Sequence, residues 1–152
     1  MRIDTEDTEI ETNLQAVRAE NSGDSHCLYM KEAWLLIALG RQTEGIATAR
    51  QAQDVWKIGR AKNPSPYGGS IFWAPWILEA AVALGEGNWS QARYCAGVVL
   101  RDFEEDQTAG TLYELALQAQ GQLPPDRLFH FSDNAAQELA DFDLRAYALR
   151  GI

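Results

Sequence analysis

Apolar residues recur every three to four positions along most of the chain, which is the spacing of one face of an α-helix. The last stretch keeps this period closely, with apolar side chains at Ala135, Leu139, Phe142, Ala146 and Leu149. The alternation typical of a β-strand does not persist for six residues anywhere. The sequence therefore predicts an all-α protein of about seven helices.

Caps and helix breakers divide this pattern into segments. Asp24 or Ser25 is suited to begin a helix, glycines at positions 40 and 87 mark turns, and the prolines and glycines of residues 63–70 interrupt any helix. We expect one domain over residues 1–152, organised as a frayed N-terminal helix (1–22), a first hairpin (26–62), a connecting loop (63–70), a second hairpin (71–104) and C-terminal helices that act as a cap (107–152).

The two hairpins are copies of one pattern, because the stretch Tyr29–Ala52 recurs 47 residues later as Trp76–Val99. Both copies place a large aromatic residue first, then small residues and a glycine at matching positions. These are Tyr29, Ala33, Gly40, Gly45, Ala49 and Ala52 in one copy, and Trp76, Ala80, Gly87, Ala92, Ala96 and Val99 in the other. Small residues let two helices approach closely, so each copy predicts an antiparallel pair.

This arrangement resembles the tetratricopeptide repeat (TPR) family over about half of the chain. The resemblance implies TPR-like stacked antiparallel helical hairpins in one right-handed α-α array, whose first helices line a concave surface for a partner. Glu32 and Glu79 depart from the family, which usually has leucine at that position. The 47-residue period also exceeds the family's usual length of about 34 residues.

The composition supports a globular protein, with 46% hydrophobic and 23% charged residues. The net charge of −9 is unevenly distributed: residues 41–62 carry five basic side chains against two acids, whereas residues 102–143 carry ten acids against one arginine. Because nucleic-acid binding requires clustered lysine and arginine, we expect no direct binding of DNA or RNA.

Localisation follows from two absences in the sequence. No stretch is long and apolar enough to span a bilayer. The first twelve residues carry five acids, where a secretory signal would have a positive start and an apolar run. We therefore expect a cytoplasmic protein with no membrane partner, and we expect Cys27 and Cys95 to be small buried hydrophobic residues.

No catalytic group can be assembled from the sequence. His26 and His130 are the only histidines, and neither has a second ligand at metal-binding spacing. His26 and Cys27 are adjacent on a predicted helix and point about 100° apart, so they do not form a nucleophile–base pair. We expect no enzyme activity, no catalytic residue, no metal site and no cofactor.

The resemblance implies a partner-binding groove. Carried over to this sequence, its lining is Met30, Lys31, Trp34 and Ile37 from the first hairpin and Ile77, Leu78, Ala81 and Leu84 from the second. Such a groove would suit an amphipathic helix or a hydrophobic peptide. The alternative is that these residues are core, covered by the first or last helix of the chain. Glu32 and Glu79 would either contact a cationic ligand or pair with neighbouring groups.

We therefore expect a protein–protein interaction module, an adaptor or chaperone, that binds an apolar or helical segment of another protein. Two alternatives stay open. One is a small acidic inhibitor, such as an immunity or anti-defence protein, acting through the acidic C-terminal half with its patch at Asp102, Glu104, Glu105 and Asp106. The other is a pocket for a hydrophobic small molecule, lined by Met30, Trp34, Trp73 and Trp76. Self-association into a homodimer also stays open, and a homodimer without another partner would favour the ligand pocket.

Overall fold

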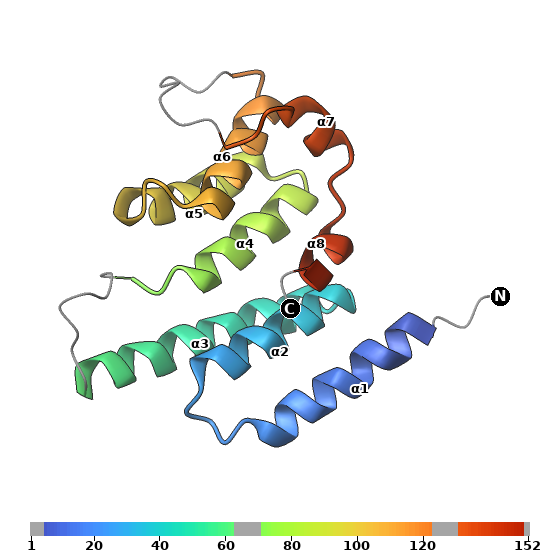
Figure 1. Ribbon diagram of the computed structural model, residues 1–152, viewed down its shortest axis with the longest axis vertical. Coiled ribbons are helices and arrows are strands. Elements are labelled where there is room, and N and C mark those ends of the chain that lie inside the picture. The colour runs from blue at the N-terminus through green and yellow to red at the C-terminus, as the bar shows by residue number, and fades with distance from the viewer. Residues whose placement is uncertain (1–4, 63–70, 123–130, 151–152) are drawn as a thin grey trace. The chain divides into compact units, whose positions relative to one another are not determined.

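The computed structural model describes residues 5–62, 71–122 and 131–150, and all regular structure in these ranges is helical (Figure 1). The helices are α1 (Thr5–Glu20), α2 (His26–Ala38), α3 (Gln42–Lys62), α4 (Ala74–Gly85), α5 (Trp89–Asp102), α6 (Gln107–Ala119), α7 (Ala135–Ala140) and α8 (Leu144–Arg150). The predicted all-α class is confirmed. The predicted loop at 63–70 lies outside the described residues.

The chain divides into two compact units. The first comprises Met1–Gly68 together with Leu144–Ile152, and the second comprises Gly69–Asp143. In the first unit α2 contacts α1, α3 and α8. In the second unit α4 contacts α5 and α6, and α6 also contacts α5 and α7 (Figure 1). Stacking of the two hairpins in one right-handed array stays a prediction.

The core of the first unit is built around α2. Every residue from Ala33 to Ala38 is buried, because this helix is apolar on all sides and has neighbours on three of them. On α3 the small residues Gly45, Ala49 and Ala52 are buried. A Cβ added to Gly45 would lie 2.7 Å from Ile37 Cδ1 and 3.1 Å from the Ala33 carbonyl oxygen. The expected close approach of these helices is therefore present.

Helices α2, α4 and α6 end with the same turn. Each is followed by a glycine with positive φ, namely Gly40 (79°), Gly87 (77°) and Gly121 (71°). The next residue donates its N–H to a carbonyl five positions back: Arg41 to Leu36 (2.9 Å), Asn88 to Ala83 (2.8 Å) and Gln122 to Leu117 (2.9 Å). This Schellman turn satisfies carbonyls at the helix end and requires a residue that tolerates the left-handed conformation. The two predicted turns are confirmed, and α6 repeats them.

The last predicted helix is wrong in one respect, because the structure breaks it in two. The Asp141 N–H closes α7 on the Gln137 carbonyl at 2.9 Å, and Phe142 N–H then bonds to the nearer Leu139 carbonyl at 3.2 Å. Aspartate is a weak helix former, so a tightened turn is favoured here. As a result the described residues form eight helices, with α7 in the second unit and α8 in the first.

A buried carboxylate fixes the chain where it enters α7. Glu114 of α6 is only 5% exposed. It accepts hydrogen bonds from the backbone N–H of Phe131 at 3.2 Å and of Ser132 at 2.7 Å. The Phe131 ring packs directly over Gly110, where a Cβ would collide with it. Charge-assisted bonds to backbone donors compensate the cost of burying Glu114.

Substitution of two glycines in α3 should change stability in opposite directions. Gly45→Ala should lower the free energy of unfolding by about 1 kcal/mol or more, because the new methyl group overpacks the contact with Ile37. Gly59→Ala is the matched control, since nothing lies within 4 Å of its Cβ position. It should raise stability by about 0.5–1 kcal/mol, because alanine loses less backbone freedom in a helix. Urea unfolding measures both; equal effects would contradict the close packing.

Removing the charge of Glu114 should also destabilise the second unit. Glu114→Gln keeps the volume but replaces one acceptor oxygen by an amide group that cannot accept from the Phe131 and Ser132 donors. The expected loss is about 1–3 kcal/mol. Thermal unfolding measures it, with exposed Glu105→Gln as the control that should leave the midpoint unchanged. An unchanged midpoint for Glu114→Gln would show that these bonds do not hold the segment.

Candidate functional site

Seven of the eight residues expected to line a groove are buried. Met30, Trp34, Ile37, Ile77, Leu78, Ala81 and Leu84 are between 0% and 8% exposed, whereas Lys31 is exposed. The structure thus corrects the expectation of an open groove at these side chains. They are core, which was the alternative derived from the sequence.

The physical reason in the first unit is the last helix, because α8 covers α2. The Tyr147 ring lies 5.8 Å from the Trp34 ring at an interplanar angle of 52°, and Ala148 is fully buried. Arg145, also on α8, forms ion pairs with Asp7 at 2.6 Å and Glu6 at 3.5 Å. We call Glu6, Asp7 and Trp34 the α8 docking surface. It receives an aromatic side chain and an arginine from one short helix.

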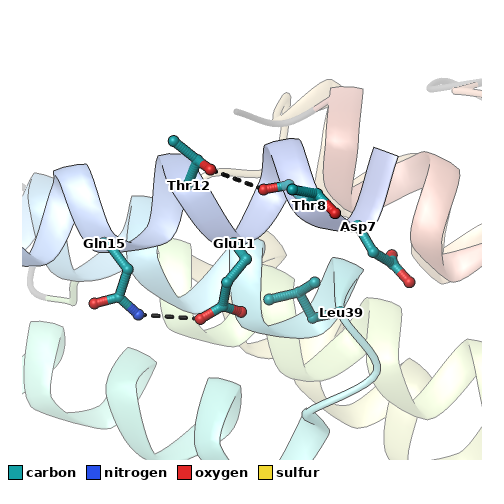
Figure 2. Close-up of a pocket in the computed structure, with 6 residues that line it drawn as sticks. All are labelled: Asp7, Thr8, Glu11, Thr12, Gln15 and Leu39. Atoms are coloured by element: carbon teal, nitrogen blue, oxygen red, sulfur yellow. Dashed lines mark hydrogen bonds between the residues drawn. The ribbon is translucent and has the colours of Figure 1, made fainter. Parts of the chain in front are cut away.

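An open depression of about 550 Å³ begins at the same aspartate and continues along α1 (Figure 2). Its lining is Asp7, Thr8, Glu11, Thr12, Gln15 and Leu39. Two of these polar side chains bond within α1: the Thr12 hydroxyl donates to the Thr8 carbonyl at 2.9 Å, and the Gln15 amide donates to Glu11 at 3.0 Å. The depression therefore presents acids and one apolar side chain, Leu39, next to the site where Arg145 is bound.

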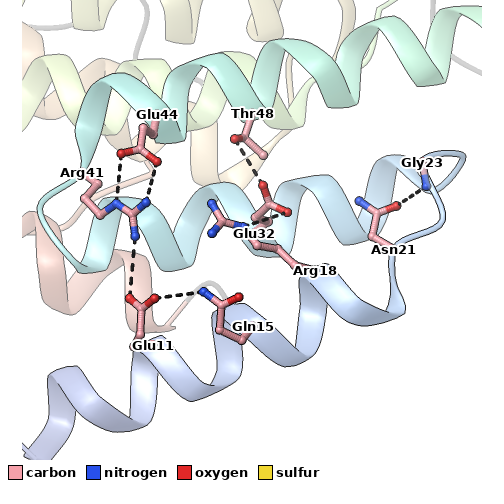
Figure 3. Close-up of polar contacts among 9 residues, drawn as sticks. All are labelled: Glu11, Gln15, Arg18, Asn21, Gly23, Glu32, Arg41, Glu44 and Thr48. Carbon is pink, nitrogen blue, oxygen red and sulfur yellow. Dashed lines mark hydrogen bonds and ion pairs between the residues drawn. The ribbon is translucent and has the colours of Figure 1, made fainter.

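A second arginine bridges the acids of α1 to the hairpin (Figure 3). Arg41 lies 3.7 Å from Glu11 and 2.6 Å from Glu44 at the start of α3. Hydrogen bonds from Arg41, above all, lower the pKa of Glu44, and those with Glu44 raise the pKa of Arg41. The acidic face of α1 thus binds arginine at two places.

Glu32 pairs with neighbouring groups of its own unit, as the simpler expectation had it. Its carboxylate lies 3.7 Å from Arg18 Nε and accepts a hydrogen bond from Thr48 at 3.5 Å (Figure 3). This residue ties α2 to both α1 and α3. Glu79, at the matching place in α4, is partly buried and also has an interaction partner. Both carboxylates thus have interactions within the chain.

The four residues of the predicted acidic patch have different roles. Asp106 caps α6, since its side chain accepts the Ala109 N–H at 2.8 Å. Asp102 is the exposed last residue of α5 and has an interaction partner. Glu104 and Glu105 lie exposed in the turn between the two helices and form no ion pair within the described part of the chain. Of the four, these two are therefore the exposed carboxylates without an ion pair in the described ranges.

Sequence reasoning missed an exposed aromatic surface in the second unit. Tyr94 is 57% exposed and Trp73 is 45% exposed. The Tyr94 ring lies 6.2 Å from Trp76, and the Trp73 ring lies 5.9 Å from Phe103. We call these four residues the aromatic surface. A signal for Tyr94 was present, because it falls off the buried face of α5 formed by Ala92, Cys95, Ala96 and Val99.

The remaining candidates give no reactive centre. The described ranges contain no group of three or more histidine, cysteine or acidic side chains placed to hold a metal ion. Cys95 is buried as expected, but Cys27 is exposed, which corrects that expectation. His130 lies outside the described residues. Of the residues expected to line a ligand pocket, Met30 and Trp34 belong to the first unit, and Trp73 and Trp76 to the second.

Comparison with known proteins identifies no relative. No family model, no curated protein and no solved structure matches this chain. Within the described residues, no helix has the length and apolar character needed to cross a membrane.

Replacing Trp34 tests whether α2 is core. Trp34→Ala should lower the free energy of unfolding by about 3–5 kcal/mol, because it empties a large buried volume beneath Tyr147. Denaturant unfolding gives the value. Ile58→Ala on α3 is the control: its side chain is 58% exposed, so it should change stability by no more than about 0.5 kcal/mol. A small effect at Trp34 would mean that this side chain is available to a partner instead.

Proposed function

We propose that this protein is an interaction module that binds an amphipathic helix of another protein on the α8 docking surface. The observation that supports it is the binding of α8 to this surface. The surface already receives a helix with one aromatic side chain on Trp34 and one arginine on Asp7 and Glu6. Helix-in-groove recognition uses this combination of an apolar anchor and a flanking charge. The TPR-like, adaptor or chaperone character inferred from the sequence belongs to the same proposal.

The resident helix is suited to displacement. α8 has only seven residues, and a helix this short is not stable in water without its tertiary contacts. Elements with few buried contacts open at low free-energy cost. α8 holds its place because it is tethered to the surface, which gives it a high effective concentration. A partner helix has to compete with that advantage.

The open depression along α1 offers a partner the means to compete. It shares Asp7 with the α8 docking surface and carries Glu11 and Leu39 as further polar and apolar contacts. A helix longer than α8 would gain these contacts in addition to those that α8 makes. An arginine- or lysine-bearing helix is favoured over an acidic one, because α1 presents three acids here.

The test uses a labelled peptide with the sequence of residues 141–150 and the full-length protein. Arg145→Glu places a carboxylate beside Asp7 and Glu6 and should release α8 from its seat. The variant should then bind the peptide about tenfold or more tightly than the wild-type chain, in which α8 competes. Fluorescence anisotropy measures the affinity, and circular dichroism verifies that the variant is folded.

Two controls make the result specific. Arg150 lies over the Tyr147 ring with its guanidinium 5.9 Å from the centroid, so Arg150→Glu should bind the peptide no better than the wild type. A peptide with glutamate at position 145 should not bind the Arg145→Glu chain. If the folded Arg145→Glu variant binds the unaltered peptide no better than the wild type does, the surface is not a helix-binding site.

An acidic inhibitor is the second candidate function, and the exposed, unpaired Glu104 and Glu105 favour it. In that case the partner is a basic active site. Its capture from lysate should be lost with Glu104→Gln/Glu105→Gln and at high salt, yet persist in the Arg145→Glu variant. If the protein binds a helix on the α8 docking surface instead, capture should persist with Glu104→Gln/Glu105→Gln and increase in the Arg145→Glu variant, because release of α8 opens that surface.

We also propose that the protein acts in the cytoplasm. Its partner is another protein and not a nucleic acid, because the charge of −9 disfavours phosphate contacts. A homodimer with exchanged α8 helices is a variant of the same mechanism. Light scattering of the purified protein distinguishes it from a monomer that awaits a partner.

A further inference from the structure

We infer that the second unit carries a separate docking site for an arginine-rich segment of another protein. The site consists of the aromatic surface, formed by Trp73, Trp76, Tyr94 and Phe103, together with the adjoining carboxylates Glu104 and Glu105. It lies on α4, α5 and the turn that follows α5. It shares no residue with the α8 docking surface, so the two sites can be tested independently.

The rings of this surface are held in place before any partner arrives. Trp73 is the N-cap of α4 and Trp76 is the third residue of that helix, so both side chains start from its first turn. Each packs edge-to-face against a ring of the α5 segment, Phe103 for Trp73 and Tyr94 for Trp76, at interplanar angles of 66° and 69°. Exposed aromatic side chains held in this way offer contact area at little cost in side-chain entropy.

Burial within the chain does not account for these rings. Tyr94 and Trp73 are two of the three large hydrophobic side chains that are exposed in the described ranges, and each contacts another member of the same surface. The Trp76 indole Nε1 is shielded from water and has no hydrogen-bond acceptor in the described part of the chain. Because a shielded atom is out of a partner's reach, the contact area for a partner comes from the exposed rings of Trp73 and Tyr94.

The negative charge beside the rings favours a partner with positively charged side chains. Phe103 leads directly into Glu104 and Glu105, which are exposed and form no ion pair in the described ranges. A partner that covers the Trp73–Phe103 pair therefore meets two carboxylates at its edge. Complementary charge at the rim of an apolar contact speeds association and fixes orientation.

Arginine fits this combination better than lysine. The planar guanidinium stacks on aromatic rings and binds a carboxylate through two parallel N–H bonds, whereas the lysine ammonium is a compact, strongly hydrated charge. The chain itself shows the contact twice, with Arg60 over Trp56 at 5.5 Å and Arg150 over Tyr147 at 5.9 Å. The partner segment is therefore assigned by its arginine side chains and not by net positive charge alone.

The experiment compares two labelled peptides of equal charge, acetylated hexa-arginine and acetylated hexa-lysine, on the full-length protein by fluorescence anisotropy. The arginine peptide should bind about fivefold or more tightly. Trp73→Ala/Tyr94→Ala should abolish this preference while leaving the weaker, charge-driven binding of the lysine peptide. Glu104→Gln/Glu105→Gln should weaken both peptides and reduce the dependence of affinity on salt.

Two controls separate the surface from general effects. Ile58→Ala removes an equally exposed side chain in the first unit and should leave both affinities unchanged. Tyr94→Ala alone serves as the second variant if the double variant does not fold, and it should lower the arginine preference at least twofold.

Equal affinity for the two peptides on the wild-type chain would overturn the inference, because the binding would then be electrostatic only. An arginine preference that survives in the folded Trp73→Ala/Tyr94→Ala variant, or in Tyr94→Ala where only that variant folds, would also overturn it, since the preference would arise elsewhere. Neither result tests the α8 docking surface, because that surface is tested with a different peptide, the one with the sequence of residues 141–150.

Discussion

The first unit depends on covering α2 from several sides at once. This helix has almost no polar face in its second half, so every neighbour that leaves it exposes apolar area. α1 and α3 supply two of the covers and come from the adjacent sequence. The third, α8, comes from the far end of the chain and brings Tyr147 onto Trp34. The ion pairs of Arg145 with α1 are therefore secondary to an apolar contact, and they set its orientation.

Much of the fold could be predicted because its signals are local. Ser25 caps α2 through a bond to the Leu28 N–H at 3.2 Å, and the glycines at 40 and 87 close the helices that precede them. Such signals involve residues within five positions of one another. The break between α7 and α8 could not be read in this way, because the apolar period continues through it. The first half of that pattern belongs to the second unit and the last half to the first unit. The spacing of neighbouring residues cannot predict this division.

The candidate groove shows a related limit. An apolar residue in a groove and one in a core obey the same helical period, and only the presence of a covering helix separates them. For Trp34 that cover is more than a hundred residues away in sequence. Tyr94 is the opposite case, since its position off the buried face of α5 follows from the spacing alone. Exposed aromatic residues on otherwise polar helix faces can thus be predicted from the sequence more easily than residues that line a groove.

The composition of the first unit from both ends of the chain also has a consequence for synthesis. α2 leaves the ribosome long before α8 exists, and the whole second unit is translated between them. Throughout that interval Trp34 and its neighbours lack their final cover, while a growing chain folds its earlier parts first. The nascent protein therefore passes through a stage in which α2 is partly uncovered, and the first unit is complete only after α8 has been made.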